Sequence, residues 1–541
     1  MNSLILLDNL INKYQEMIEK NSVKYPDLAL LQMKAFDSSV VNHHKIKNGD
    51  ELNFDLLWPS ILIYSYEDFL QPFYKPLPIV KDYHNLMIKN LFFHQHLNKI
   101  IKVREMYKHK LVNMEILTDN SIAISIDKTA NIGYEYLEME DYVLSKNDIE
   151  IKRNTKREIS IKRHMNNKVR VFNKKYIAYT TNKKIDDYYR LLASKFTKEF
   201  YGKRTFDSEA NFNGIEFNKY VESIELLTSI ALKHFDYCML LIKKEPYIKW
   251  FDILTVNKYI SDEIETLMIG LNIAHDDARK IIELLIYTKS DLEKCKNKKA
   301  VPPIFIRLTN NMLARSTLSL ISGSSYMYLL TQLQSRFPED WSREQPKLEI
   351  VFREEICDLF LLRKKCICLD SNINLNMKKR RITDVDTVII DNLSNTISLF
   401  QLIWQEPFGQ SISERESKQR NFINTSEKWL IDVKKWLSDS TDKEKADAFR
   451  VKLNLMRKDW KFKFFIIGRY FSRFSFKIYN DETTTWCNWY RFKAIAEKID
   501  INTLNFFDQL SYQIDKSYEN QQKNLKLEAD KIYVEDSILH M

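Results

Sequence analysis

Glycine is scarce in this chain, which has eight glycines among 541 residues. The two closest, Gly202 and Gly214, are twelve positions apart. A phosphate-binding P-loop requires two glycines about five positions apart followed by a lysine, and the dinucleotide-binding fingerprint requires three within about six. The sequence therefore excludes P-loop ATPases and GTPases and the common NAD-dependent enzymes. The scarcity of glycine, together with only 11 prolines, predicts long helices and few tight turns.

Cysteine pairs of the zinc-binding Cys-x-x-Cys spacing and long apolar runs are also missing. The six cysteines show no Cys-x-x-Cys spacing, which argues against a zinc ribbon, and their scatter is typical of a reducing cytoplasm. No apolar run reaches the roughly 18 residues of a membrane-spanning helix. The start of the chain has no basic segment and carries Asp8 early, so we expect no signal peptide. These features predict a cytoplasmic protein without a membrane partner.

The chain is long enough for three or four domains at about 150 residues each. Its hydrophobic content of 44% and charged content of 29% are ordinary for a globular protein. We predict an α+β protein that is mostly helical, with a C-terminal α/β domain behind helical regions and a small basic β-containing region. The predicted parts are an N-terminal helical region at 1–110, a small β-rich basic region at 111–184, a helical domain at 185–337, the α/β domain at 338–500 and a helical tail at 501–541.

Apolar periodicity changes along the chain from helical to alternating and back. The predicted helices before residue 340 are Leu4–Lys20, Asp55–Phe73, Tyr83–Tyr107, Asp186–Tyr201, Asn218–Lys243, Ser261–Leu271, Asp276–Tyr287 and Asn310–Leu333. The predicted strands there are Val112–Leu117, Ser121–Asp127 and Ile132–Met139. We also expect a charged helix at Gln509–Lys531.

The segment Ile151–Lys184 is strongly basic, with twelve lysines and arginines and a single acid, Glu158. Its β-branched and aromatic residues predict strands at Arg157–Arg163, Lys168–Val171 and Lys175–Ala178. One interpretation is a surface for the phosphate backbone of DNA or RNA. The other is a solvated sheet edge whose lysines prevent aggregation. The candidate nucleic-acid-binding residues are Lys152, Arg153, Lys156, Arg157, Lys162, Arg163, Lys168, Arg170, Lys174 and Lys175.

A β-hairpin is predicted where Val385–Ile390 and Ile397–Ile403, both rich in β-branched residues, flank a cluster of turn formers. A four-residue loop at Asn392–Asn395 would place Asp386 directly opposite Gln401. Cross-strand partners have Cβ atoms about 5 Å apart, so these two side chains would share one face. An acid and an amide placed in this way can hold a hard cation through oxygen. The alternative is an aspartate that only bonds turn amides at a strand start.

Two short motifs resemble those of the PD-(D/E)XK nuclease superfamily, which has the restriction-endonuclease-like fold. They are Asp384-Val385-Asp386 and, on the second strand of the hairpin, Gln401-Leu402-Ile403-Trp404. The resemblance covers about residues 345–500. It implies that Asp386 and Gln401 hold Mg²⁺ and that a lysine stands two residues after the second ligand. Ile403 occupies that position here.

The predicted order of elements around the hairpin is also that of the superfamily: helix, strand, hairpin, helix, strand. The elements are a helix at Leu348–Lys365, a strand at Cys366–Leu369, a polar loop containing Lys378–Arg381, the hairpin, a helix running towards Trp436, a strand at Lys461–Ile467 and a helix around Trp486–Lys498. The resemblance implies a glutamate on the first helix, which would be Glu354 or Glu355. Lys418 or Arg415, on the helix after the hairpin, could replace the missing lysine.

Two functions follow as hypotheses. The first is an Mg²⁺-dependent nuclease that cleaves DNA or RNA, with prokaryotic defence as the setting suggested by family analogy. The second is a catalytically inactive subunit that binds nucleic acid or acts as a scaffold, and Ile403 favours it. Other protein subunits or self-association are further partners that either function allows.

Overall fold

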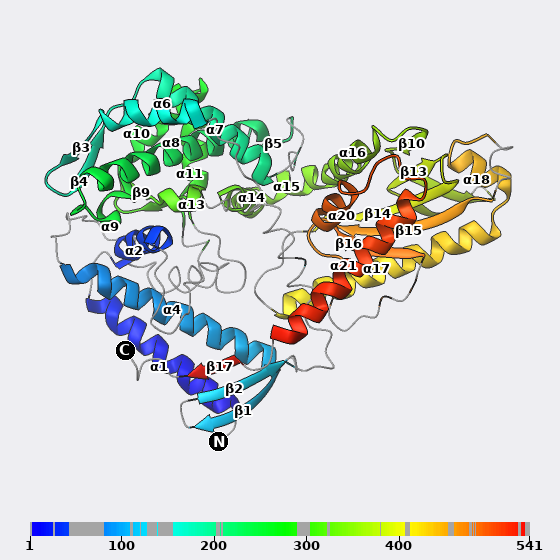
Figure 1. The fold of residues 1–541 in the computed structure, drawn as a ribbon, viewed down its shortest axis with the longest axis horizontal. Coiled ribbons are helices and arrows are strands. Elements are labelled where there is room, and N and C mark those ends of the chain that lie inside the picture. The colour runs from blue at the N-terminus through cyan, green and yellow to red at the C-terminus, as the bar shows by residue number, and fades with distance from the viewer. Residues whose placement is uncertain are drawn as a thin grey trace.

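The computed structural model is a mixed α and β protein in which helices predominate, as the sequence predicts (Figure 1). Its helices and strands gather into an N-terminal part, a helical body and a C-terminal α/β block, and the chain passes from the second to the third near residue 345. The structure describes residues 3–24, 28–42, 81–108, 112–118, 121–126, 138, 155–201, 206, 209–288, 291, 303–321, 325–378, 380–405, 412–452, 459–474, 479, 481, 483–528 and 532–535.

The N-terminal part combines helices with a small sheet to which the end of the chain contributes. Helices α1 (Ser3–Lys24) and α4 (Lys81–Lys108) lie side by side, and α2 (Leu28–Asn42) packs against α4. Strands β1 (Val112–Thr118) and β2 (Ser121–Ile126) confirm two predicted strands and pair as a hairpin, and β17 (Ile532–Glu535) pairs with β2. The predicted helix at 55–73 lies outside the described residues, as does all of the predicted strand at 132–139 except Glu138.

From residue 155 onward, the basic segment folds as a helix followed by a hairpin. Strands β3 (Val169–Phe172) and β4 (Tyr176–Tyr179) confirm two of the predicted strands to within one residue at each end. The predicted strand at 157–163 is wrong, because this stretch belongs to α6 (Thr155–Asn166). Ile161 is buried together with Met165, one helical turn further on, whereas Ile159 is 52% exposed. The isoleucines at positions 159 and 161 therefore do not mark one face of a strand, because one faces solvent and the other lies in the core of a helical region.

The helical body is built on the long helix α8, whose apolar face is buried between two cores. Its helices are α7 (Lys183–Tyr201), α8 (Phe217–Lys244), α9 (Trp250–Ile253), α10 (Ile260–Leu271), α11 (His275–Leu285), α13 (Thr317–Ile321), α14 (Ser325–Arg336), α15 (Pro338–Glu344) and the short η2 (Gln345–Lys347). Its strands are β5 (Asn211–Phe212), β6 (Ile215–Glu216), β7 (Val256–Tyr259), β8 (Phe305–Arg307) and β9 (Met312–Arg315). The predicted helix at 310–333 is wrong at its start, where β9 pairs with β7 and β8.

The C-terminal block contains a five-stranded sheet with the strand order β10-β13-β14-β15-β16. The first three strands are antiparallel, and the last three are parallel. The strands of the five-stranded sheet are β10 (Cys366–Leu369), β13 (Thr387–Asp391), β14 (Thr396–Ile403), β15 (Lys461–Gly468) and β16 (Thr484–Asn488). The block also contains β11 (Ile373–Met377) and β12 (Arg380–Val385). Its helices are α16 (Leu348–Phe360), α17 (Ile412–Asp439), α18 (Asp442–Ala448), α20 (Trp489–Ala496) and α21 (Phe506–Glu528).

Helices cover both faces of this sheet. One core contains Val388, Leu399 and Ile466 of the sheet together with Trp429 and Trp436 of α17. The core on the opposite face joins the sheet to residues of α16, α20 and α21. The predicted order of helix, strand, hairpin, helix and strand is observed in α16, β10, β13–β14, α17 and β15.

Three predicted details in this block are wrong. The predicted polar loop containing 378–381 belongs largely to the hairpin β11–β12, which forms a separate two-stranded sheet. The predicted helix around 486–498 starts only at Trp489, because the residues before it belong to the buried strand β16. Helix α16 ends at Phe360 rather than at 365. The predicted charged helix of the tail is present as α21, but its apolar face packs against the sheet.

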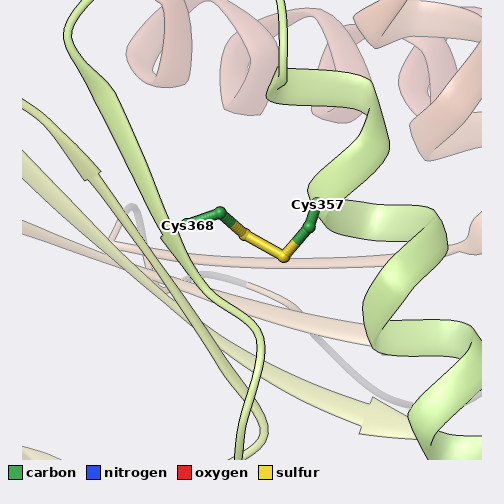
Figure 2. The surroundings of a disulfide bond; sticks show 2 residues. All are labelled: Cys357 and Cys368. Atoms are coloured by element: carbon green, nitrogen blue, oxygen red, sulfur yellow. A yellow bond between two sulfur atoms is a disulfide. The ribbon is translucent and has the colours of Figure 1, made fainter.

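Two cysteines of this block form a disulfide that is not predicted from the cysteine spacing (Figure 2). Cys357 of α16 and Cys368 of β10 are 11 residues apart, and their Cα atoms are 5.8 Å apart. The bond ties α16 to the edge strand of the sheet. Over the described ranges, no helix combines the length and the apolar character that crossing a membrane requires.

Candidate metal centre

Asp386 lies at the junction between the two sheets of the C-terminal block. The chain leaves β12 at Val385 and enters β13 at Thr387, so Asp386 is the single residue between these strands. Its backbone N–H donates to the carbonyl of Phe400 at 3.1 Å, and its side chain is only 6% exposed. The hairpin register is the predicted one, since Asp391 pairs with Thr396 and Thr387 pairs with Phe400.

The carboxylate of Asp386 contacts β14 as the register predicts. Its Oδ2 atom accepts a hydrogen bond from Nε2 of Gln401 at 2.9 Å and another from the backbone N–H of Leu402 at 2.6 Å. The structure therefore brings together the two residues predicted from the sequence to be metal ligands.

Two further acids act on this carboxylate through their charges. Burial raises the pKa of Asp386 from 3.8 to about 7, and the hydrogen bond from Leu402 opposes this rise only in part. The negative charges of Glu349 and Asp384 raise the same pKa further, while the positive charge of Arg353 lowers it. Asp386 is thus a buried acid held among like charges, a condition that a bound cation would relieve.

Helix α16 supplies both Glu349 and Arg353, four residues apart and therefore on one face of the helix. Glu349 is exposed at the surface, yet desolvation of its carboxyl by neighbouring groups raises its pKa, and the charge of Arg353 opposes this effect. The guanidinium of Arg353 is held in place, since Nε donates to the carbonyl of Glu349 at 3.2 Å and Nη1 donates to Oδ1 of Asn372 at 2.8 Å. Asp384 pairs with Arg381 at 3.0 Å. Three carboxylates, one amide and one fixed guanidinium therefore act on one another at this junction.

The structure does not bring either predicted glutamate to Asp386. Glu355 is buried on α16 and pairs instead with the buried Arg469, whose guanidinium lies 5.0 Å from the ring centre of Trp404. Glu354 is exposed to solvent. Glu349, which does act on Asp386, lies five residues earlier. The sequence shows that α16 carries acids, but only the packing of the helix on the sheet decides which acid faces Asp386.

No described lysine or arginine nitrogen lies within 4.0 Å of the Asp386 carboxylate. Lys418 is half-buried on α17 and forms no ion pair with Asp386, and the side chain of Arg415 lies outside the described residues. Ile403 is half-buried and packs against the core that contains Ile397 and Leu399. The positive charge that acts on Asp386 comes instead from Arg353.

The donors at this site fit Mg²⁺ by their chemistry. All are carboxylate or amide oxygens, and proteins usually hold Mg²⁺ by one or two carboxylates, with water and substrate phosphate completing its coordination. Asp386 and Gln401 are the contacting pair, and Glu349 and Asp384 act on Asp386 only through their charges. Among the residues that the structure describes, no group of three or more histidine, cysteine, aspartate or glutamate side chains is arranged to hold a metal ion. A cation here would therefore depend on few protein ligands.

The basic segment forms a separate surface on the helical body. Lys162 pairs with Glu158 at 2.7 Å, and Lys175 lies 3.6 Å from Asp252. Lys168 is half-buried, and Lys152 and Arg153 lie outside the described residues. The exposed members of this basic surface are Lys156, Arg157, Arg163, Arg170 and Lys174, with Lys183 and Lys184 close in sequence.

The tip of the β3–β4 hairpin presents part of this basic surface to solvent. Asn173 and Lys174 both have left-handed backbones, with φ values of 48° and 61°. This geometry is typical of a tight hairpin turn and is unusual for lysine. Phe172, beside them, is 53% exposed.

Comparisons with protein families, with curated proteins and with solved structures find no match for this chain.

Proposed function

We propose that this chain is a nucleic-acid-acting protein whose C-terminal block is a divalent-metal-dependent nuclease of the restriction-endonuclease-like type. The observation that carries this proposal is the contact between Asp386 and Gln401, with Glu349 and Asp384 close enough to raise the pKa of the buried carboxyl. Clustered carboxylates with a raised pKa are typical of functional sites. The order of helix, antiparallel strands, helix and parallel strand around them supports the same assignment.

Asp386 and the amide oxygen of Gln401 would hold Mg²⁺, with Glu349 or Asp384 as a further carboxylate. The cation would supply positive charge to a phosphodiester and lower the pKa of a water molecule. Gln401 can present its oxygen after a rotation of its amide group, since one end of an amide accepts and the other donates. Arg353, anchored by Asn372, would hold a positive charge beside the phosphate in place of the missing lysine.

The basic surface would bind the backbone of DNA or RNA independently of sequence. Its exposed arginines and lysines are the side chains that neutralise phosphates, and binding of this kind weakens steeply with salt. A defence role against foreign nucleic acid remains the setting that the family resemblance suggests.

Cleavage of DNA and RNA by the full chain, with Mg²⁺ or Mn²⁺, tests this proposal. Asp386→Asn should lower the cleavage rate more than about 100-fold, since changes even to residues behind a metal ligand often cost about 10- to 100-fold. Asp370→Asn, which alters an exposed carboxylate of the same block, should cleave like the wild-type protein. Arg353→Ala should lower the rate, and Arg353→Lys should recover part of it. Cleavage that survives Asp386→Asn would contradict the proposed site.

A second function, nucleic-acid binding without cleavage, is favoured by one observation. Ile403 occupies the lysine position and packs against the core. If salt-sensitive binding is present while neither metal supports cleavage, the C-terminal block is a binding or scaffolding subunit, and attention moves to the basic surface. If binding is absent as well, both functions are contradicted for the isolated chain.

A further inference from the structure

The β3–β4 hairpin has one face toward the core of the helical body and one face away from it. Cross-strand partners lie on the same face of an antiparallel pair, and side chains alternate along each strand. The partners Val171 and Ile177 pack against the core. Phe172 and Tyr176 are partners on the opposite face, and Arg170 lies on that face too, two residues before Phe172. The outer face therefore carries two aromatic residues and an arginine.

The two aromatic rings of this face are available for contact. Phe172 is 53% exposed although it belongs to a strand, and Tyr176 is half-buried. The ammonium group of Lys175 lies 5.1 Å from the ring centre of Tyr176 and 3.6 Å from Asp252. Neither ring is among the described residues of the core beneath the hairpin. A single exposed ring is ordinary on a protein surface, but two neighbouring rings outside the core suit contact with another flat π system.

The charge around these rings is positive. Positions 167–180 contain four lysines and arginines and no acid. Arg170, on the face of the rings, is exposed. Lys174 is also exposed, and its left-handed backbone helps to turn the chain just after Phe172. A ligand that suits this face therefore combines negative charge with flat apolar groups.

We propose that Arg170, Phe172, Lys174 and Tyr176 form a stacking platform for the unpaired bases of single-stranded nucleic acid. Proteins that bind single strands combine a positive surface for the backbone with aromatic side chains on which bases stack. Bases in a duplex already stack on one another, so the platform selects single strands. Neither stacking nor phosphate contacts read the 2′-hydroxyl that distinguishes RNA from DNA, so single strands of both kinds should bind. The platform rests on the proposed function as a nucleic-acid-acting protein and defines the class of substrate that its basic surface holds.

The stacking platform lies apart from the candidate metal centre. The β3–β4 hairpin is at one end of the molecule, and the sheet that contains β14 is toward the other end (Figure 1). The platform would therefore hold a strand without touching the groups at Asp386. Its loss should weaken binding of the strand and leave the cleavage rate of a bound strand unchanged.

Binding of labelled single-stranded oligonucleotides to the full chain, measured by fluorescence anisotropy in EDTA to prevent metal-dependent cleavage, tests the proposal. Phe172→Ala should bind a single strand about tenfold more weakly than the wild type, which is the scale of stacking one base. Phe172→Tyr should keep most of the affinity, because its ring also stacks. Tyr512→Ala removes an exposed ring that lies beside Lys516 in the C-terminal block, and it should bind like the wild type. If Phe172→Ala binds the single strand as tightly as the wild type, the proposal is overturned.

Three comparisons separate stacking from charge. Phe172→Ala should leave the slope of log affinity against log salt concentration unchanged, whereas Arg170→Ala should reduce it by about 0.7, the value for one phosphate contact on a single strand. Duplex DNA should bind Phe172→Ala and the wild type alike. A strand whose nucleotides lack bases should also bind the two proteins alike. If Phe172→Ala loses as much affinity for the duplex, or for the strand without bases, as for the normal single strand, Phe172 does not act on unpaired bases and the proposal is overturned.

The outcomes for the stacking platform and for the proposed nuclease can be told apart. If Asp386→Asn abolishes cleavage while Phe172→Ala binds single strands normally, the platform is wrong and the nuclease stands. If the wild type cleaves nothing while Phe172→Ala loses affinity for single strands, the platform stands without the nuclease. If Phe172 is needed for binding to vesicles of anionic lipid and not for binding to single strands, the hairpin tip contacts a membrane surface and the platform is contradicted.

Discussion

Asp386→Asn should stabilise the protein in alkaline solution and should have little effect on stability in acid. The pKa of this carboxyl is raised from 3.8 to about 7 in the folded chain. Between those values the folded state keeps a proton that the unfolded state has lost, so stability falls as pH rises from about 4 to about 7. Each pKa unit corresponds to about 1.4 kcal/mol, so the full cost of ionising Asp386 approaches 4 kcal/mol above pH 7.

Asparagine avoids this cost without removing the local contacts. Its Oδ1 can accept from the backbone N–H of Leu402, as Asp386 does. Its Nδ2 can donate to Gln401 once the amide of Gln401 turns over. The free energy of unfolding of Asp386→Asn should therefore match that of the wild type near pH 4 and exceed it by up to about 4 kcal/mol at pH 8.

Urea unfolding followed by tryptophan fluorescence measures this difference in the relevant block, since six of the nine tryptophans lie between 404 and 489. Asp370→Asn, at an exposed position, controls for the loss of one negative charge. The contributions of other titrating groups to the pH dependence of stability cancel when the variant is compared with the wild type. A stability difference that does not change between pH 4 and pH 8, or a variant less stable than the wild type at pH 8, would refute the reasoning.

Two further predictions concern the disulfide and the basic surface. Reduction of Cys357–Cys368 should lower the free energy of unfolding by about 3 kcal/mol, which is the chain-entropy estimate for a short loop. The double variant Cys357→Ser/Cys368→Ser should not respond to the reductant. If urea unfolding shows the same response to the reductant in the wild type and in the double variant, the disulfide is contradicted. The double variant Arg170→Ala/Lys174→Ala should reduce the slope of log affinity for duplex DNA against log salt concentration by about two, whereas Lys498→Ala should leave this slope unchanged. If filter binding gives the double variant the same slope as the wild type, these two residues do not contact DNA.

The hairpin register could be predicted from sequence because it depends on neighbouring residues. Turn formers at 391–395 lie between two runs rich in β-branched residues, and the four-residue loop fixes every pair, including the approach of Asp386 to Gln401. Strand β10 and helix α17 were also predicted, since their apolar patterns are local. These elements needed no knowledge of the rest of the fold.

Features that depend on packing between distant segments could not be predicted in this way. The charges of Glu349 and Arg353 act on Asp386 because α16 lies on the sheet with one particular rotation, and the sequence alone does not distinguish Glu349 from Glu354 or Glu355. The contact between Glu138 and Ser472 spans 334 positions. In α6, spacing alone could not show that Ile161 is buried and Ile159 exposed.

Binding of Mn²⁺ to the full chain at pH 8, measured by calorimetry, tests the candidate metal centre most directly because it needs no knowledge of the substrate. We predict that the wild-type protein and Asp370→Asn bind Mn²⁺ alike, that Asp386→Asn loses this binding, and that Glu349→Gln weakens it while Glu354→Gln does not. A cation site at Asp386 and Gln401 would be contradicted if Asp386→Asn binds Mn²⁺ as tightly as the wild-type protein. It would also be contradicted if the wild-type protein binds no Mn²⁺ even with an oligonucleotide present.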